Sequence, residues 1–130
     1  YHGPGQLVGY PIIDLRKTGI GVKSYIKNIE ALLIATLDDY SINAHTKDNK
    51  PGVWIKNKKI GSIGIHVSHG VTTHGFSLNV NTDMNYFSNI ISCGIDDVLM
   101  TSMEKELGTN FFMNDIKQSI IKHFNQLFRA

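Results

Sequence analysis

The stretch Val53-Trp54-Ile55-Lys56-Asn57-Lys58-Lys59-Ile60-Gly61-Ser62-Ile63-Gly64-Ile65-His66-Val67 decides the fold of this chain. Residues 53–55 and 59–67 are apolar and rich in β-branched side chains, which favour extended backbone. Between them, Lys56-Asn57-Lys58 has the polar composition of a tight turn. The pattern predicts a β-hairpin, and Pro51-Gly52 just before it indicates another turn.

Strand and helix patterns flank this hairpin. Residues 6–15 favour a strand in which Pro11 marks an edge or a bulge, because proline lacks a ladder donor. Residues 76–80 predict a further short strand. From Val22 onward, apolar residues recur at three- and four-residue steps and predict one face of an amphipathic helix. That face consists of Val22, Tyr25, Ile26, Ile29, Leu32, Leu33, Leu37 and Tyr40.

Two shorter patterns near the carboxyl end predict helices. Thr101-Ser102-Met103-Glu104 has the spacing of a capping box. A second apolar stripe, with Asn114 or Asp115 as its cap, runs through Ile116, Ile120, Phe124, Leu127 and Phe128. The order strand, helix, several strands, helices predicts an α+β domain with a mixed or antiparallel sheet and flanking helices.

The composition of the 130 residues, 42% hydrophobic and 18% charged, predicts one soluble globular domain over residues 1–130. The longest apolar run, residues 31–35, is far too short to span a membrane. A net charge of +2 is too small to indicate nucleic-acid binding. Because Tyr1-His2-Gly3-Pro4-Gly5-Gln6 resembles the middle of a motif and no methionine precedes it, we expect an amino-terminally truncated fragment.

A cluster of five lysines lies within thirteen residues: Lys47, Lys50, Lys56, Lys58 and Lys59. Such a cluster could dock an acidic partner. It could also be a solvated hairpin edge that lysine protects from pairing with other strands.

Cys93, in Ser92-Cys93-Gly94-Ile95, is the only cysteine and cannot form an internal disulfide. It is either a small buried hydrophobic residue or a sheltered, reactive thiol that Gly94 leaves open to a ligand. A thiol of ordinary pKa is only a few per cent ionised at neutral pH, so a nucleophile needs a nearby positive charge or base. The histidines or a lysine could supply it.

Among these groups, Lys59 is the better placed candidate for the positive charge or base beside the Cys93 thiol. Strand alternation from Lys58 predicts that Lys59 lies opposite Lys58 and on one face with Gly61, Ile63 and Ile65. A lysine beside the thiol would stabilise its anion, and could accept its proton if burial lowered the lysine pKa. The alternative is that Lys59 is an ordinary surface residue.

Glycines predict a groove along these strands. Gly61, Gly64 and Gly75 lack side chains, so a linear acyl chain could lie against them. Its walls would be Ile63, Ile65 and Phe76. The alternative function of these glycines is to allow bulges or tight packing.

His74, which we expect at the start of a strand, either donates to a substrate carbonyl or ties down the turn. His66, His69 and His74 could bind zinc together with Cys93, but no metal-ligand spacing supports that interpretation. No phosphate-binding glycine motif is present either. We therefore expect no metal or nucleotide cofactor.

Five stretches together resemble the lipoyl(octanoyl) transferases, over residues 1 to about 102. They are Tyr1-His2-Gly3-Pro4-Gly5-Gln6-Leu7-Val8-Gly9-Tyr10-Pro11, Gly52-Val53-Trp54, Lys59-Ile60-Gly61-Ser62-Ile63-Gly64, His74-Gly75-Phe76-Ser77-Leu78-Asn79-Val80 and Cys93-Gly94-Ile95. The chain departs from the family pattern in three places. The usual Arg-Gly-Gly before Tyr1 is absent from this chain, Gly61 replaces alanine, and Ser92 replaces proline.

The resemblance implies a fold like the catalytic domain of biotin and lipoate protein ligases, and an octanoyl transferase activity. The donor would be octanoyl-acyl carrier protein, and the acceptor a lysine in a lipoyl domain of a dehydrogenase complex or glycine cleavage protein. Cys93 would carry the acyl thioester, while Lys59 would lower the thiol pKa and serve as acid and base. The implied substrate-binding residues are Tyr1, His2, Ser62, Ile63, Gly64, Gly75, Phe76 and Ser77, with His74 as a further candidate.

Two other functions compete with this one. An ATP-dependent lipoate or biotin protein ligase of the same fold would not need Cys93. A noncatalytic module could instead bind carrier proteins or lipoyl domains. For the transferase we expect a monomer in the bacterial cytoplasm or in the matrix of a mitochondrion or plastid, with neither nucleic acid nor membrane as a partner.

Overall fold

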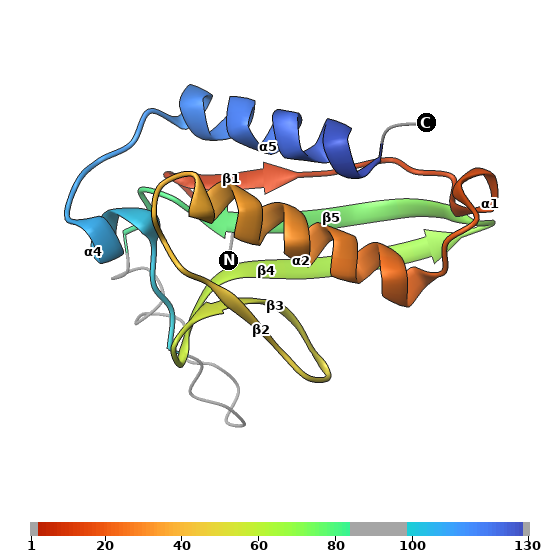
Figure 1. Cartoon of the computed structure of the whole chain (residues 1–130), viewed down its shortest axis with the longest axis horizontal. Coiled ribbons are helices and arrows are strands. Elements are labelled where there is room, and N and C mark those ends of the chain that lie inside the picture. Colours follow the sequence, from red (N-terminus) through yellow and green to blue (C-terminus); the bar gives the residue numbers. More distant parts are fainter. Residues whose placement is uncertain (1–2, 84–98, 129–130) are drawn as a thin grey trace.

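The computed structural model describes residues 3–83 and 99–128, which form one sheet with helices packed against it (Figure 1). The five strands lie in the order β1-β5-β4-β3-β2, and each is antiparallel to its neighbours. They are β1 (Gln6–Gly9), β2 (His45–Lys47), β3 (Lys50–Ile55), β4 (Lys58–Ser68) and β5 (Val71–Asn79). The predicted α+β class with an antiparallel sheet is confirmed.

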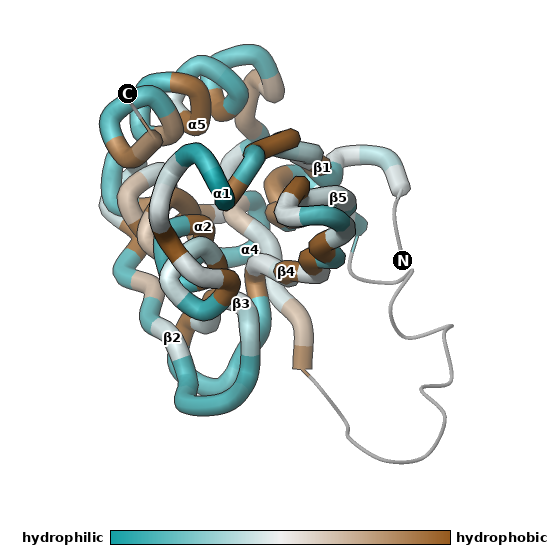
Figure 2. The backbone as a smooth tube through the Cα atoms, turned by 90° about the vertical axis from the view of Figure 1, so that its right-hand side faces the viewer, coloured by the Kyte–Doolittle hydropathy of each residue, from teal (hydrophilic) through white to brown (hydrophobic). Residues whose placement is uncertain are grey.

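The helices are α1 (Leu15–Thr18), α2 (Val22–Asp38), α4 (Met103–Leu107) and α5 (Met113–Leu127). The two long helices α2 and α5 lie on the same side of the sheet (Figure 2). The helix predicted from Val22 is confirmed as α2, although Val22 itself is exposed. The fully buried face of α2 includes Tyr25, Ile29, Leu32, Leu33 and Leu37.

The predicted hairpin is confirmed as β3 and β4, joined at Lys56 and Asn57. The prediction of a turn at Pro51-Gly52 is wrong, because both residues lie inside β3. The preceding turn lies instead at Asp48 and Asn49, where Asn49 adopts a φ of +61°. Asparagine tolerates this left-handed conformation because its short polar side chain can hydrogen-bond to nearby backbone.

Other boundaries also differ from the prediction. The strand expected over residues 6–15 ends at Gly9. Further along, Asp14 forms an isolated antiparallel bridge with Val71 and caps α1 by accepting a hydrogen bond from the Arg16 N–H at 3.0 Å. The strand expected over residues 76–80 starts earlier, at Val71, because it pairs with the full length of β4.

Both carboxyl-terminal helices are confirmed, but their caps were mispredicted. Ser102, rather than Thr101, caps α4 by accepting from the Lys105 N–H at 3.1 Å. Helix α5 begins one residue earlier than its predicted cap, with Phe112 at the N-cap. Asn114 and Asp115 therefore lie in its first turn, where the Asp115 carboxylate complements the positive end of the helix dipole.

The hydrophobic core fills the space between the sheet and the two long helices. Leu7 of β1, Val53 of β3, Ile60 of β4 and Leu78 of β5 contribute to it from the sheet. Within the described residues, no helix is long and apolar enough to cross a membrane. The core thus occupies one face of the sheet and leaves the other face available for a site.

Candidate functional site

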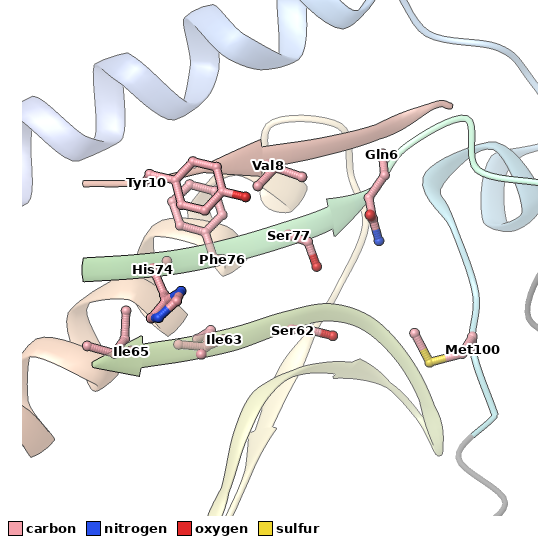
Figure 3. Close-up of a pocket in the computed structure, with 12 residues that line it drawn as sticks. Gln6, Val8, Tyr10, Ser62, Ile63, Ile65, His74, Phe76, Ser77 and Met100 are labelled. Atoms are coloured by element: carbon pink, nitrogen blue, oxygen red, sulfur yellow. The ribbon is translucent and has the colours of Figure 1, made fainter. Parts of the chain in front are cut away.

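A pocket of about 580 Å³ lies on the sheet face that the long helices leave open (Figure 3). Leu7 and Leu78 point into the core, so strand alternation turns Gln6, Val8 and Ser77 toward the opposite face. The lining residues are Gln6, Val8, Tyr10, Ser62, Ile63, Gly64, Ile65, His74, Gly75, Phe76, Ser77 and Met100. A volume of this size is typical of small-molecule sites.

Polar groups lie toward both ends of the pocket. Tyr10, Ile65 and His74 lie at one end, and Gln6, Ser62 and Met100 lie toward the other (Figure 3). Ser62 and Ser77 are direct cross-strand partners in the middle of the pocket. The pocket therefore combines apolar surface from Val8, Ile63 and Phe76 with two serine hydroxyls near its middle.

A buried asparagine fixes the Met100 end of the pocket. Gln6 Nε2 donates to Asn79 Oδ1 at 2.8 Å, and Asn79 Nδ2 donates to the Thr101 carbonyl at 3.0 Å. Asn79 is fully buried, so losing either bond would leave an uncompensated polar group inside the protein. These bonds hold the segment that carries Met100 against the sheet.

The same segment pairs with the backbone of Lys59. The Lys59 N–H donates to the Leu99 carbonyl at 2.7 Å, and the Thr101 N–H donates to the Lys59 carbonyl at 2.9 Å. This short parallel bridge places Lys59 opposite Met100, which lines the pocket. Lys59 itself is not a lining residue, but it lies at the Met100 end.

The predicted face of Lys59 is wrong. Lys59 pairs with Trp54 and Gly61 pairs with Val53, so a bulge at Ile60 shifts the register between them. Trp54 and Val53 are consecutive and point to opposite faces, so Lys59 and Gly61 do too. The bulge turns Lys59 away from the core and toward the face that carries the pocket.

The side chain of Lys59 is half-buried on that face. A Cβ atom added to Gly52 would lie 2.9 Å from Lys59 Cε, so the lysine chain crosses directly over this glycine. Gly52 is the register partner of Ser62, a pocket residue. Burial lowers the pKa of Lys59, because the ammonium form loses solvation.

The three groove glycines have different functions. A Cβ on Gly64 would meet nothing within 4 Å, which fits the predicted groove. A Cβ on Gly61 would lie 2.7 Å from Val53 Cγ2, and one on Gly75 would collide with the Gly9 carbonyl oxygen. Gly61 and Gly75 therefore fit the alternative of tight packing, and only Gly64 leaves open space.

The predicted walls of the groove line the pocket but also belong to the core. Phe76 is buried in the core cluster, and Ile63 and Ile65 pack against it. These side chains therefore contribute less exposed surface than the alternation pattern suggested. The bulge at Ile60 accounts for the difference. Without it, Ile63 and Ile65 would share a face with Lys59; with it, alternation from Gly61 directs them to the opposite face, toward the core.

His74 lies inside β5 rather than at its start, which corrects the prediction. Its φ of +60° is left-handed, a conformation that costs a non-glycine residue about 1 kcal/mol or more and is concentrated at functional sites. Its ring centroid is 6.2 Å from that of His66. Among the described residues, no group of three or more His, Cys, Asp or Glu side chains could hold a metal ion.

The pocket thus gathers most of the predicted substrate-binding residues: Ser62, Ile63, Gly64, His74, Gly75, Phe76 and Ser77. Tyr1, His2 and Cys93 lie outside the described residues. The pocket also contains four residues that were not predicted: Gln6, Val8, Tyr10 and Met100. The first three belong to a stretch that resembles the family motif, whereas Met100 carries no local sequence signal.

Solved structures define the class of this fold. The chain matches biotin protein ligase from Aquifex aeolicus with a TM-score of 0.75 at 16% identity, over 95% of this chain and 52% of that one. A lipoate-protein ligase A bound with ATP matches with a TM-score of 0.69 at 12% identity, over 94% and 50% of the two chains. The fold is therefore that of the catalytic domains of biotin and lipoate protein ligases.

Sequence comparison narrows the class to a family. The model of the lipoyl protein ligase A/B catalytic domain matches residues 1–125, and this chain belongs to that family. It is 47% identical to an octanoyltransferase of Cytophaga hutchinsonii, over 98% of this chain and 55% of the relative. It is 45% identical to an octanoyltransferase of Koribacter versatilis, over 99% and 53%. The chain thus spans little more than half the length of these curated relatives.

Proposed function

We propose that this chain is the acyl-binding part of an octanoyltransferase in protein lipoylation. The observation that carries the proposal is the half-buried Lys59 at one end of a pocket lined by the family-like strand motifs. The 47% identity to a protein named octanoyltransferase favours this activity over others of the same fold. We further propose that residues 1–130 form a single catalytic unit.

The dimensions of the pocket suit a medium-length acyl chain. Its floor on β4 runs from Ser62 to Ile65, roughly 10 Å at about 3.4 Å per residue, which is comparable with an extended octanoyl group. Gly64 leaves space above this floor. The hydroxyls of Ser62 and Ser77 lie where the chain would approach its carbonyl end.

Cys93 is the proposed nucleophile. Its thiolate attacks the carbonyl carbon of octanoyl-acyl carrier protein, a new S–C bond forms, and the S–C bond to the carrier breaks. The leaving carrier thiolate takes up a proton from the Lys59 ammonium. An acceptor lysine amine of a lipoyl domain then attacks the enzyme thioester, forming an amide and releasing Cys93, while Lys59 accepts the amine proton. The transfer needs no external energy source, because exchange between two thioesters is nearly balanced and the step from thioester to amide runs downhill.

The environment of Lys59 supports these steps. A lysine of ordinary pKa is almost fully protonated at neutral pH and accepts protons poorly. Burial lowers the Lys59 pKa and so brings the group closer to the range in which it can both give and take a proton. A free nucleophilic cysteine also requires a reducing compartment, which suits the proposed bacterial cytoplasm or organelle matrix.

The test uses the complete protein and measures its intact mass after incubation with octanoyl-acyl carrier protein. We expect a mass gain of one octanoyl group, which thiol blocking prevents and which the Cys93→Ser variant lacks. The Lys59→Met variant should fold but acylate about 100-fold more slowly or worse, as expected when an acid–base group is lost. An unchanged adduct on Cys93→Ser would contradict the proposal.

The fold favours one rival, an adenylating ligase, because both structural neighbours named above are ligases. Adding a lipoyl domain to the same reaction separates the candidates. Transfer from octanoyl-acyl carrier protein without ATP supports the transferase, and strict ATP dependence with free octanoate supports the ligase. Binding of either partner without any turnover would indicate the noncatalytic module instead.

A further inference from the structure

Trp54, the only tryptophan of the chain, is buried in an unusual place. Its exposed fraction is 4%, yet it does not belong to the hydrophobic core cluster. Its neighbour Val53 points into that core, so Trp54 points to the opposite face of the sheet. The indole therefore lies on the face of the pocket, and packing of the main core does not account for its presence.

Two lysines approach this indole. Lys59 Nζ lies 5.4 Å from the ring centroid, and Lys47 Nζ lies 5.1 Å from it. Both distances fall within the range of a cation–π interaction, for which tryptophan is the best ring. Lys59 reaches the ring because it is the direct cross-strand partner of Trp54.

Gly52 makes the contact with Lys59 possible. A Cβ at this position would lie 2.9 Å from Lys59 Cε and 3.3 Å from Trp54 Cη2. The absence of a side chain thus opens the space in which the lysine and the indole meet. The backbone of Gly52 is held in turn by the Glu30 carboxylate of α2, whose Oε2 accepts from the Gly52 N–H at 3.2 Å.

Among the described residues, the indole is the group that approaches the Lys59 ammonium with a favourable electrostatic contact. Glu30 reaches Gly52 from the helix side of the sheet, Lys58 precedes Lys59 on β4, and Lys47 extends from β2. Residues 99–101, which pair with Lys59, carry no charge. Within the described part of the chain, no carboxylate forms a salt bridge with Lys59.

We propose that Trp54 is a positioning residue for Lys59: its indole holds the lysine ammonium over Gly52, beside the Met100 end of the pocket. The ring offsets part of the penalty that burial imposes on the ammonium, so it keeps Lys59 both protonated and in place. A lysine chain has four rotatable bonds, and an attractive surface restricts it to the conformations that face the pocket. The inference rests on the proposed acyl transfer, in which Lys59 handles the proton.

The first experiment measures the pH dependence of enzyme acylation in the complete protein for Trp54→Leu and Trp54→Phe. Leucine covers Lys59 without a π face, so the lysine pKa should fall and the alkaline limb of the rate profile should move about 0.5 to 1 unit lower. We expect the acylation rate at its optimum to drop about three- to tenfold, with KM within twofold. In Trp54→Phe the acylation rate should fall by less than half as much as in Trp54→Leu, when both changes are expressed as logarithms.

Lys47→Met is the matched control, because it removes the other ammonium from the same ring. Its profile should superimpose on that of the wild type. A Trp54→Leu profile equal to the wild type, or a phenylalanine variant no better than leucine, would overturn the proposal. An equal shift in Lys47→Met would overturn it as well, since that variant leaves the Trp54–Lys59 contact in place.

The second experiment does not depend on changing Trp54. Because the chain has a single tryptophan, its fluorescence reports on the charge beside this one ring. Lys47 is first replaced by methionine, because its ammonium also lies beside the ring. Emission should change as pH rises through the Lys59 pKa in Lys47→Met, and this transition should be missing when Lys59→Met is added to Lys47→Met. A transition that persists in the double variant would refute the contact.

The two proposals can fail separately. If Cys93→Ser still gains an octanoyl group, the proposed transferase mechanism fails whatever the Trp54 variants do. If acylation depends on Cys93 and Lys59 but neither the pH profile nor the emission depends on the Trp54–Lys59 pair, only the positioning function fails.

Discussion

A single extra residue in β4 determines which side chain faces the pocket. Simple alternation grouped Lys59 with Gly61, but the bulge at Ile60 breaks that pattern. Two residues of one strand then oppose one residue of the other, so side chains on either side of the bulge exchange faces. The lysine that matters for the proposed chemistry lies on the pocket face of the sheet because of this irregularity.

The glycines of the pocket give a prediction at the residue scale. Gly64→Leu should fold normally, because its added Cβ meets nothing within 4 Å, but it should fill the groove. We expect acylation by octanoyl donors to fall at least tenfold while a short acyl donor, such as a butanoyl thioester, retains most of its rate. Intact-mass kinetics with the two donors measures this selectivity.

Gly75→Ala is the matched contrast on the paired strand. Its methyl group would collide with the Gly9 carbonyl, so β1 must shift and the variant should lose about 2 kcal/mol or more of unfolding free energy. Urea denaturation measures the difference. Equal losses of stability in Gly64→Leu and Gly75→Ala would contradict the distinction between an open and a packed glycine.

At the scale of elements, one carboxylate joins the end of α2 to α5. Asp39 Oδ2 accepts from Lys122 Nζ at 3.3 Å and from His123 Nε2 at 2.8 Å, and also from the Ser119 hydroxyl. These bonds, chiefly those from Ser119 and His123, lower the pKa of Asp39 to about 2. The three donors lie on one face of α5, so the carboxylate helps to set how this helix packs on α2.

This junction predicts pH-dependent stability. Because the pKa of Asp39 is lower in the folded state than its ordinary value of 3.8, its contribution is full above that value and disappears as pH falls toward 2. The side chain is about a third exposed, so we expect Asp39→Asn to cost only about 1 kcal/mol at pH 7.

Urea unfolding at pH 7 and at pH 3 tests this prediction. The difference between wild type and Asp39→Asn should shrink by roughly half near pH 3. Asp38→Asn, next in sequence and exposed, should stay within about 0.5 kcal/mol of wild type at both pH values. A constant Asp39→Asn effect across this range would show that the ionised carboxylate is not the cause.

At the scale of the whole molecule, most residues that stabilise the fold and most residues of the site lie on opposite faces of the sheet. The long helices α2 and α5 lie on one side of the sheet (Figure 2). Most of the core lies on that side, whereas the pocket, Lys59 and Trp54 lie on the other face. Residues far apart in sequence meet on the pocket face, as the Gln6–Asn79 hydrogen bond shows. Changes in core residues that do not line the pocket should therefore alter stability without changing which acyl chain the pocket accepts.

Tyr25 at the centre of the core provides a test of this separation. Among the described residues its hydroxyl has no hydrogen-bond partner, and burial raises its pKa. The Thr72 hydroxyl, which lowers that pKa to a smaller extent, already donates to the Pro11 carbonyl and accepts from the Ile13 N–H. Tyr25→Phe removes an unsatisfied group, so stability should be unchanged or rise by up to about 1 kcal/mol.

Urea unfolding and acylation kinetics together check this prediction. Tyr25→Leu should lose about 2 kcal/mol, because it leaves a cavity and removes the ring that packs 5.5 Å from the ring of Phe128. Both variants should keep the wild-type preference for acyl chain length. A loss above about 1 kcal/mol in Tyr25→Phe would mean that the hydroxyl has a partner after all.

The sequence by itself determined the elements whose pattern is local. The β3–β4 hairpin and α2 follow from the spacing of apolar residues over a single strand or helix, and the family follows from motifs that are contiguous in the chain. Most of the pocket residues were predictable for the same reason, because they belong to two such motifs on paired strands.

Only the tertiary structure decided how those motifs face one another. The bulge at Ile60 depends on the register between β3 and β4, the short pairing of Lys59 with Met100 brings a distant segment to the pocket, and Trp54 meets Lys59 across two strands. Each of these contacts joins residues whose own neighbours in sequence give no sign of the partner. Local periodicity fixes an element, but the packing energy of the assembled sheet selects the register and therefore the site.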